Sequence, residues 1–385
     1  MNAYQKEDLI TIAKRDNNKK RPFLLVNPLQ GKHLAVSPSA SRKLFKTLAH
    51  QVFSRREVDY SHTLVIGFAE TATAIGASLS IDAPFPVSYI QTTREKYEGK
   101  DFLYFSEEHS HATDQMVIKD FLDETLNSGC HILFAEDEVT TGNTIENFIQ
   151  VLLKTYPKHH LSFGIASILN GMGKEKLAEL EQRGIAVDYL LAVPSYRYDE
   201  ILSKYTYEQE LCHDYTTGSH PILDSKTSGS YETLVCGHYA DTRLGVSAPD
   251  YEVQCCHLAE QVVSQLDLSQ QDTPLRILVL GTEECMYPAI ALGQYVEEHT
   301  CHQVRFHATT RSPILPSREE EYPIKERYCL HSFYEQERIT YLYNLWDYDL
   351  CIVVTDSKAE TTAMEELCDA LQNKIREKII LVNWR

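Results

Sequence analysis

The sequence lacks a long apolar run. None of its 385 residues belongs to a stretch of about 18 consecutive apolar residues, the length that a helix needs to cross a membrane. The first residues, MNAYQKEDLITIAKRDNNKKRP, are charged and contain no apolar core of the kind found in secretory signals. We therefore expect a cytoplasmic protein that does not bind membranes.

Positive charge is also scarce. Lys and Arg number 37 against 55 Asp and Glu, which gives a net charge of −18 with neutral histidines. A protein that binds nucleic acid needs a basic face that displaces the counterions of the phosphate backbone. The charge balance therefore argues against a nucleic-acid partner.

Paired cysteines are absent as well. Ten cysteines are present, nine of them beyond residue 200, and none forms a C-x-x-C pair. Without paired spacing, the sequence predicts reduced and mostly buried thiols.

Short apolar runs alternate with helical patterns in the first half of the chain. Short apolar strands separated by helices are typical of an α/β fold whose mainly parallel sheet is covered on both faces. The expected strands are 62–67, 86–91, 131–136, 161–166 and 187–193, and the expected helices lie near 41–54, 70–80, 116–127, 144–155 and 173–183.

The second half of the chain repeats the first. The matches keep the same order, at an offset of between 210 and 219 residues: LAHQVFS (48–54) with LAEQVVS (258–264), LVIGFAE (64–70) with LVLGTEE (278–284), PVSYIQTTR (86–94) with QVRFHATTR (303–311), and ILFAED (132–137) with CIVVTD (351–356). A collinear repeat of this kind indicates a tandem duplication of one α/β unit. We therefore predict a first domain at 1–194, a linker or cap at 195–224, and a degenerate second copy at 225–385.

One stretch, ILFAEDEVTTGNT (132–144), carries the chemistry. Glu136 and Asp137 follow a buried strand, and a polar loop then opens a helix. Backbone N–H groups at a helix start bind phosphate, and Gly142 allows the backbone to approach closely. Carboxylates beside this loop can accept hydrogen bonds from sugar hydroxyls or hold water on a metal. Together these features describe a site for a 5-phosphoribosyl group, whereas a simple helix cap would explain only one acid.

This stretch resembles the motif with which type I phosphoribosyltransferases bind the sugar diphosphate PRPP. The chain is most similar to the orotate phosphoribosyltransferase-like branch that carries a C-terminal domain named for a Thr-Arg-Ser-Pro (TRSP) motif. That motif stands here at residues 310–313. Proteins of this pairing are associated with bacterial tellurium-resistance and stress gene clusters. The resemblance covers about residues 25–193 and 225–385, and it implies two Rossmann-like domains.

The resemblance assigns roles to residues of the first domain. It implies that Glu136 and Asp137 bind the ribose hydroxyls, that the PRPP loop consists of Val139, Thr140, Thr141, Gly142, Asn143 and Thr144, and that the pyrophosphate loop consists of Phe68, Ala69, Glu70 and Thr71. Glu70 departs from the family pattern. An acid beside pyrophosphate needs Mg²⁺ or a basic partner, unless it only interacts favourably with a helix N-terminus.

The same resemblance places a mobile hood over the site, from Thr92 to Gln115. Arg94 is the best candidate to neutralise pyrophosphate and to act in catalysis, with Lys96 and Lys100 as weaker candidates. His109 and His111 in the hood form an H-x-H pair, which is a weak zinc signal because no further ligand is spaced nearby. A role in the hood is the preferred interpretation.

The second copy is not expected to bind PRPP. Thr355 stands where the first copy has Glu136, and Glu360 places a negative charge where Thr141 would contact phosphate. Arg311 and Ser312 of the TRSP motif could still contribute to the first domain's site, as a neighbouring subunit does in dimeric family members. Alternatively, Arg311 only orders its own loop. If the motif does contribute to that site, the chain would be a built-in pseudo-dimer. It could also form a homodimer.

The predicted function is a Mg²⁺-dependent phosphoribosyltransferase. It would transfer 5-phosphoribosyl from PRPP to a nitrogen of a heteroaromatic base and release pyrophosphate, with Mg²⁺ held mainly by PRPP and water. No residue pattern identifies the base. The alternative is a PRPP-binding regulatory or scaffold protein without turnover.

Overall fold

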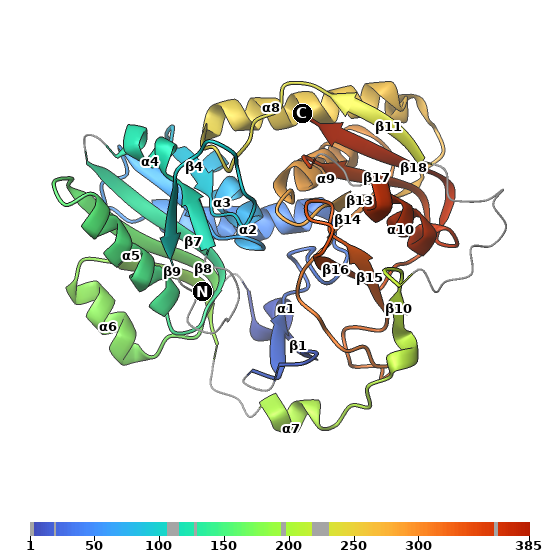
Figure 1. The fold of residues 1–385 in the computed structure, drawn as a ribbon, viewed down its shortest axis with the longest axis horizontal. Helices are drawn as coiled ribbons and strands as arrows, with labels where there is room; N and C mark the ends of the chain where they lie inside the picture. Colours follow the sequence, from blue (N-terminus) through green and yellow to red (C-terminus); the bar gives the residue numbers. More distant parts are fainter. Residues whose placement is uncertain are drawn as a thin grey trace. The chain divides into compact units, whose positions relative to one another are not determined.

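The computed structural model describes residues 4–18, 21–105, 115–126, 129–193, 198–217, 231–357 and 361–385 (Figure 1). The chain forms two compact units. The first unit consists of Met1–Tyr4, Lys43–Ser195 and Ala240–Gln254, and the second consists of Gln5–Arg42, Tyr196–Tyr239 and Cys255–Arg385. No described helix is both long and apolar enough to span a membrane.

The first unit is built on a six-stranded sheet of order β12-β4-β3-β7-β8-β9. Its strands are β3 (Thr63–Gly67), β4 (Ser88–Gln91), β7 (Cys130–Val139), β8 (Leu161–Asn170), β9 (Ala186–Ala192) and β12 (Val246–Ser247). All neighbouring pairs are parallel except β12, which runs antiparallel to β4. The prediction of a mixed α/β fold with a mainly parallel sheet is confirmed.

Helices connect these strands, as expected for parallel neighbours. They are α3 (Ala72–Ile81), α4 (Lys119–Thr125), α5 (Asn143–Thr155) and α6 (Lys174–Gln182), and a further helix, α2 (Pro38–Phe53), precedes β3. Every residue of β3 is buried, which requires cover on both faces of the sheet. Aromatic side chains pack between these elements: Phe105 stacks on Phe148 of α5 with ring centroids 4.1 Å apart, and Phe68 meets Phe148 edge-on.

A two-stranded antiparallel hairpin, β5 (Phe102–Phe105) with β6 (Gln115–Ile118), forms the described part of the predicted hood. The predicted helix at 116–127 was therefore wrong at its start, because Gln115–Ile118 pair with β5 and α4 begins only at Lys119. Tertiary pairing outweighs local helical periodicity here. His109 and His111 lie outside the described residues.

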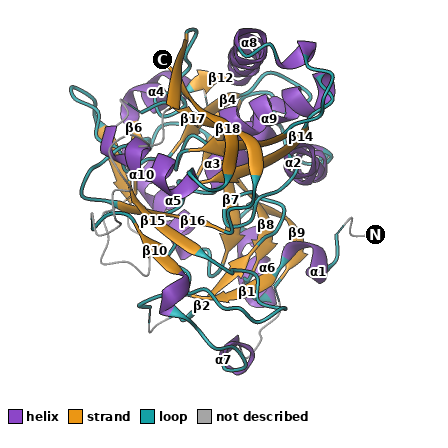
Figure 2. Ribbon diagram, turned by 90° about the vertical axis from the view of Figure 1, so that its right-hand side faces the viewer, coloured by secondary structure: helices purple, strands orange, loops and turns teal. Residues whose placement is uncertain are grey.

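The second unit contains a five-stranded parallel sheet of order β11-β18-β17-β13-β14. Its strands are β11 (Tyr231–Cys236), β13 (Arg276–Gly281), β14 (Gln303–Ala308), β17 (Tyr348–Thr355) and β18 (Ile375–Trp384). The helices of this unit are α1 (Lys6–Leu9), α7 (Tyr198–Leu202), α9 (Tyr287–His299) and α10 (Thr361–Leu371). Helix α8 (Ala248–Gln265) is shared, since its residues up to Gln254 belong to the first unit and those from Cys255 on to the second. Two smaller sheets complete the second unit, β1 (Thr11–Lys14) with β2 (Phe23–Val26), and β10 (Cys212–Asp214) with β15 (Arg327–His331) and β16 (Ile339–Tyr343) (Figure 2).

The two main sheets share strand order and register. The order β4-β3-β7-β8 in the first corresponds to β14-β13-β17-β18 in the second. Gly67 lies opposite Ala135 and Gln91, and Gly281 lies opposite Val354 and Ala308. These are the residues that the sequence repeat aligns with one another. An antiparallel hairpin follows the β4 and β14 strands in both units.

Hydrogen bonds at the strand ends repeat as well. The Thr92 N–H donates to Gly67 O at 2.9 Å, and the Thr309 N–H donates to Gly281 O at 3.0 Å. The fifth strands differ, because β9 follows β8 in the sequence whereas β11 precedes all the other strands of its sheet.

Each unit is completed by a segment from the other half of the sequence. Val246 and Ser247 form β12 at the edge of the first sheet, beside β4. The β1–β2 hairpin belongs to the second unit, where Ala13, Leu24 and Val26 pack with Ile314, Tyr322, Ile324 and Tyr343. The limits predicted for the domains, 1–194 and 225–385, stay a prediction, and the described part of 195–224 contains α7, a 3-10 turn and β10.

This exchange predicts how a divided chain behaves. Co-expressed pieces 1–224 and 225–385 should co-purify through a tag on one piece, because each holds a segment that the other piece's unit needs. Piece 1–224 alone should be poorly soluble, since each apolar side chain of the hairpin that loses its cover costs about 1.5–3 kcal/mol. Two pieces that are separately soluble, folded by circular dichroism and unassociated would contradict this prediction.

Candidate functional site

Three segments predicted to form the site begin at one edge of the first sheet. Gly67 at the end of β3 lies opposite Ala135 of β7 and Gln91 of β4. Neighbouring strands lie about 4.8 Å apart, so the chains that continue from these residues emerge side by side. The structure thus brings together the pyrophosphate loop, the start of the hood and the acidic stretch. Ligands of α/β sheets bind at this carboxyl edge.

The acidic residues lie within the strand rather than in the loop after it. Strand β7 continues to Val139, with Glu136 opposite Ser167 and Glu138 opposite Leu169 of β8. Successive side chains of a strand point to opposite faces. Asp137 therefore lies on the other face from Glu136, and all three acids keep partial contact with solvent. This alternation reduces the repulsion between adjacent carboxylates.

The predicted phosphate loop ends at a helix N-terminus. Gly142 is buried, has a φ of +82° and directly precedes α5. A Cβ atom at this position would lie 2.7 Å from Sδ of Met172. Thr140, Thr141 and Thr144 supply hydroxyl groups around this turn, and the Asn143 N–H donates to Thr141 Oγ1 at 3.3 Å. The backbone geometry suits a phosphate oxygen at the start of the helix.

An acid in the first turn of α5, Glu146, is compensated by two basic residues. Both Lys176 and Arg183 form ion pairs with its carboxylate. Burial alone would raise the pKa of Glu146, but the hydrogen bonds from Lys176 and Arg183 outweigh burial and lower it. Its negative charge is therefore offset by partners of its own instead of opposing an anion at the loop.

The segment from Phe68 to Thr71 is buried and tied to the hood. The Ala69 N–H donates to Thr92 Oγ1 at 2.8 Å, and Gln115 Nε2 donates to Ala69 O at 3.2 Å. The Thr92 hydroxyl donates to Gln115 Oε1 at 2.6 Å. The loop, the end of β4 and the start of β6 thus form one hydrogen-bonded unit, in which Glu70 is only 8% exposed.

The three basic candidates of the hood differ in their surroundings. Arg94 is half-buried directly after Thr92 and Thr93, where the chain leaves β4. Lys96 is exposed, and Lys100 places its Nζ 2.7 Å from Asp120 Oδ2. Of the three, Arg94 is the residue whose position best suits the pyrophosphate loop.

Two residues that sequence reasoning missed support the base of the hood. The Tyr97 hydroxyl donates to Asp241 Oδ2 at 2.6 Å, and the Thr242 hydroxyl donates to Gln91 Oε1 at 2.7 Å. The Gln91 N–H also donates to Thr242 O. Because Asp241 and Thr242 are more than 140 residues away in the sequence, no local pattern could have indicated them.

At the corresponding edge of the second sheet, acidic side chains have partners within their own unit. Asp356, which the repeat aligns with Asp137, accepts hydrogen bonds from the hydroxyls of Tyr239 and Tyr334. Glu283 accepts a hydrogen bond from Ser332 at 2.5 Å and pairs with Arg338.

The TRSP arginine has an acidic partner within its own unit. Arg311 Nη2 lies 3.8 Å from Glu284 Oε1. The repeat aligns these two residues with Arg94 and Glu70 of the first unit. Glu360 lies outside the described residues.

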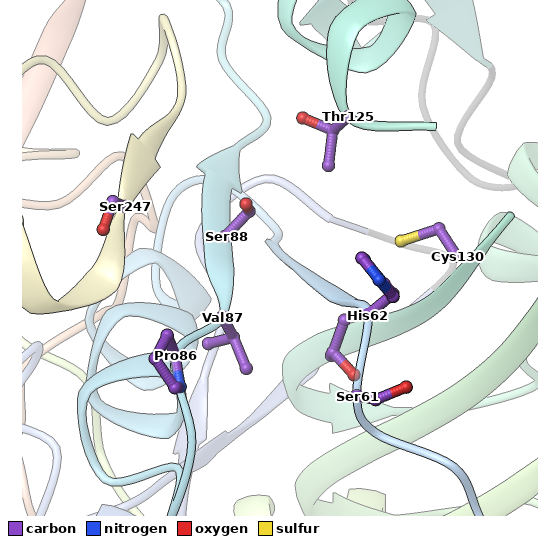
Figure 3. Close-up of a pocket in the computed structure, with 9 residues that line it drawn as sticks. Ser61, His62, Pro86, Val87, Ser88, Thr125, Cys130 and Ser247 are labelled. Carbon is purple, nitrogen blue, oxygen red and sulfur yellow. The ribbon is translucent and has the colours of Figure 1, made fainter. Parts of the chain in front are cut away.

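A separate pocket of about 180 Å³ lies at the opposite, amino edge of the first sheet (Figure 3). Its lining consists of Ser61, His62, Thr63, Pro86, Val87, Ser88, Thr125, Cys130 and Ser247. Burial raises the pKa of Cys130 to about 11, so its thiol stays protonated near neutral pH. The pocket contains none of the predicted site residues and lies at the start of β3, β4 and β7.

Comparison with known proteins finds two family matches. Residues 9–194 match a family described as phosphoribosyl transferase, and residues 241–371 match the TRSP domain that lies C-terminal to that transferase domain. No curated protein matches the chain.

Solved structures of adenine phosphoribosyltransferases are among the structural matches. The Rhodothermus marinus enzyme is 18% identical over 49% of this chain and 96% of its own, with a TM-score of 0.33. The Saccharomyces cerevisiae enzyme, complexed with an imino-altritol bisphosphate and adenine, is 12% identical over 47% and 94%, with a TM-score of 0.31. The Trypanosoma brucei enzyme, in complex with AMP, pyrophosphate and ribose-5-phosphate, is 13% identical over 40% and 64%, with a TM-score of 0.29.

The geometry of the loop predicts the effect of a substitution at Gly142. Gly142→Ala should lower the free energy of unfolding by about 1–2 kcal/mol, because a Cβ is strained at positive φ. Urea unfolding measures this change. Gly237→Ala is the matched control, since Gly237 has no positive φ and a Cβ there would meet nothing within 4 Å. Equal stability of the two variants would show that the backbone at Gly142 does not adopt this conformation.

Proposed function

Because the chain belongs to the phosphoribosyl transferases that carry a C-terminal TRSP domain, we propose that it transfers 5-phosphoribosyl from PRPP to a nitrogen of a heteroaromatic base and releases pyrophosphate. One observation carries the proposal. The acidic stretch of β7, the loop before α5 and the segment after β3 meet at one carboxyl edge, as a sugar with phosphates at both ends requires.

Each part of PRPP has a proposed partner. The 5-phosphate lies at the loop from Val139 to Thr144, where N–H and hydroxyl groups surround the start of α5. Glu136 and Asp137 accept hydrogen bonds from the ribose hydroxyls. The diphosphate lies along Phe68–Thr71, beside Arg94. This arrangement places C1 of the ribose between the acidic strand and the pyrophosphate loop.

The second unit suggests how the acid at Glu70 is tolerated. Glu284 and Arg311 pair at 3.8 Å in the second unit. Their counterparts in the repeat, Glu70 and Arg94, follow neighbouring strands in the same register. We infer that Arg94 is the basic partner that Glu70 needs, and that it stabilises the charge developing on the leaving diphosphate.

Magnesium fits this site as a companion of the substrate. The described residues contain no group of three or more His, Cys, Asp or Glu side chains placed to hold a metal ion. Mg²⁺ commonly keeps several waters and takes oxygens from substrate phosphates and from one or two carboxylates. PRPP and water would hold most of the coordination sphere, with one carboxylate of the acidic stretch (Glu136 or Asp137, which lie on opposite faces of β7) at its edge, and bound Mg²⁺ would offset the charge of the diphosphate.

The proposed reaction breaks the bond between C1 and the diphosphate oxygen. Positive charge develops on the ribose as in glycoside cleavage, and a ring nitrogen of the base then forms the new bond to C1. Closure of the hood would exclude water, which otherwise hydrolyses PRPP. The hydrogen bond from Tyr97 to Asp241 holds the segment that leads from β4 into the hood.

The second unit is proposed to be a degenerate copy that no longer binds PRPP. Its strand order, register and strand-end hydrogen bonds repeat those of the first unit. Each carboxylate oxygen of Asp356 already accepts a hydrogen bond from a tyrosine hydroxyl, so a ribose diol would have to compete with Tyr239 and Tyr334 for this group. Arg311 and Ser312 remain candidates for a contribution to the first unit's site.

The acidic pair provides a test of substrate binding. Glu136→Gln combined with Asp137→Asn should weaken PRPP binding at least a hundredfold, because charged hydrogen bonds contribute about 1.5–3 kcal/mol each. The double variant should unfold at the same temperature or higher, since repulsion between the acids is relieved. Calorimetry with Mg-PRPP measures the affinity, with the exposed Glu181→Gln as control. Unchanged affinity would rule out the site.

Turnover separates an enzyme from a regulator. Release of pyrophosphate from Mg-PRPP, assayed with a panel of purine, pyrimidine and other heteroaromatic bases, should occur with at least one base. Arg94→Ala should lower kcat by about a hundredfold or more, as expected for a group that stabilises transition-state charge. Lys100→Ala should change kcat by only a few fold, because Asp120 already holds that side chain. Arg311→Ala in the same assay measures the contribution of the TRSP motif.

PRPP binding without turnover of any base would favour the regulatory or scaffold alternative. Equal effects of Arg94→Ala and Lys100→Ala would contradict the role given to Arg94.

A further inference from the structure

A tight turn of the first unit is formed by the first residues of the TRSP domain. The match to that domain begins at Asp241, and the chain from Ala240 to Gln254 belongs to the first unit. The Leu244 N–H donates to Asp241 O at 3.0 Å, and the Gly245 N–H donates to Thr242 O at 3.4 Å. Gly245 has a φ of +86°, a conformation that favours glycine. The turn from Asp241 to Gly245 therefore has a defined backbone conformation.

The carboxylate of Asp241 joins this turn to the segment that follows β4. Its Oδ2 accepts the Tyr97 hydroxyl at 2.6 Å, and its Oδ1 accepts the Arg243 N–H at 2.9 Å. The Arg243 side chain is only 2% exposed and places Nη1 3.7 Å from the same Oδ1. The buried guanidinium thus compensates the charge of Asp241. Tyr97 is held by a hydrogen bond to an ionised group, which is stronger than one between neutral groups.

The next residue, Thr242, holds the end of β4. Its hydroxyl donates to Gln91 Oε1 at 2.7 Å, and its carbonyl oxygen accepts the Gln91 N–H at 3.1 Å. Both residues are buried, so water does not compete for these hydrogen bonds. Asp241 and Thr242 therefore fix two points of the chain on either side of the start of the hood, Tyr97 and Gln91.

Arg94 lies midway between these two points. Gln91 precedes it by three positions, and Tyr97 follows it by three. Between them, the Thr93 N–H donates to Met116 O at 2.8 Å, and the Met116 N–H donates to Thr93 O at 3.3 Å. The backbone on both sides of Arg94 is therefore held by hydrogen bonds.

The same turn contacts the helix that follows the β5–β6 hairpin. A Cβ at Gly245 would lie 2.1 Å from the Phe121 ring, so this ring packs directly on the glycine backbone. Phe121 belongs to α4, which begins directly after β6. One turn thus contacts the end of β4, the segment after it and the helix at the other end of the predicted hood.

We propose that Asp241 and Thr242 are positioning residues for phosphoribosyl transfer, which hold Arg94 beside the pyrophosphate loop. This inference rests on the proposed function, because it depends on the role given there to Arg94. Neither residue contacts the substrate. Both act through the backbone between Gln91 and Tyr97, so the TRSP domain contributes to the first unit's site through its first residues.

The experiment uses the full chain with Tyr97→Phe, which removes one hydroxyl and keeps the ring. In the assay of pyrophosphate release from Mg-PRPP, this variant should lower kcat about tenfold, because a hydrogen bond to a charged group is lost. The KM for PRPP should change by less than about twofold, as expected when only an interaction with the transition state is weakened. The matched control is Tyr189→Phe on β9, which three strands separate from β4, and it should have wild-type kinetics.

A cycle of double variants separates positioning from support of the fold. If Asp241 acts through Arg94, Tyr97→Phe should have no further effect on kcat in an Arg94→Ala chain. A residue that merely supports the fold would lower kcat by the same factor in both backgrounds. Asp241→Asn, which removes the charge that Tyr97 contacts, should show the same dependence on Arg94.

Limited proteolysis tests the contact without turnover. Trypsin cleaves after Arg94, Lys96 and Lys100, and these cuts should be about tenfold faster in Tyr97→Phe, because opening of this segment no longer breaks the bond to Asp241. Cleavage at the wild-type rate would overturn the proposal, as would an equal loss of kcat in both backgrounds of the cycle. Absence of turnover in the wild-type chain would count against the proposed function, and the cleavage rates would then decide this inference by themselves.

Discussion

The close approach of α3 to β3 at Gly67 is the constraint on which the first unit's site depends. A Cβ at Gly67 would lie 2.8 Å from Ala72 O, and one at Gly76 would lie 2.8 Å from the Gly67 Cα. With no side chain between them, the chain turns from strand to helix within a few residues and keeps Phe68–Thr71 against Thr92. Gly281 of the second unit is under the same constraint, since its Cβ would lie 2.7 Å from Cys285 O. In both sheets, a tight turn after this glycine thus determines where the strand ends and the following helix begins.

The distribution of charge at this edge follows from the same architecture. Three adjacent acids are tolerated because strand β7 continues through them and sends successive side chains to opposite faces. Glu146, the acid closest to the phosphate loop along α5, is compensated by Lys176 and Arg183 from the next helix and its end. The acids near the predicted phosphate loop therefore either lie on strand β7 or, like Glu146, form ion pairs with basic side chains.

The exchange of segments between the two halves of the sequence links the family's two domains. Residues matched by the transferase family include the β1–β2 hairpin, which packs in the second unit beside the TRSP segment. Residues matched by the TRSP domain include Asp241 and Thr242. Asp241 accepts a hydrogen bond from Tyr97 at the start of the predicted hood, and Thr242 donates one to Gln91 of β4 in the first unit. Neither unit is complete without the other half of the chain. The two segments matched by the family models therefore do not coincide with the two compact units.

The sequence by itself determined five strands of the first sheet, the acidic stretch with its glycine loop and the repeat, because each depends on residues that are neighbours in the chain, whereas the sixth strand, β12, comes from the other half of the chain. Only the tertiary structure decided that Gln115–Ile118 form a strand, that Glu136–Glu138 belong to β7, and that Asp241 meets Tyr97. It also decided that two tyrosine hydroxyls donate hydrogen bonds to Asp356 in the second unit. These features rest on pairing and hydrogen bonds between residues far apart in the sequence. Periodicity records which face of an element is apolar, but it does not record which distant residue will lie against that face.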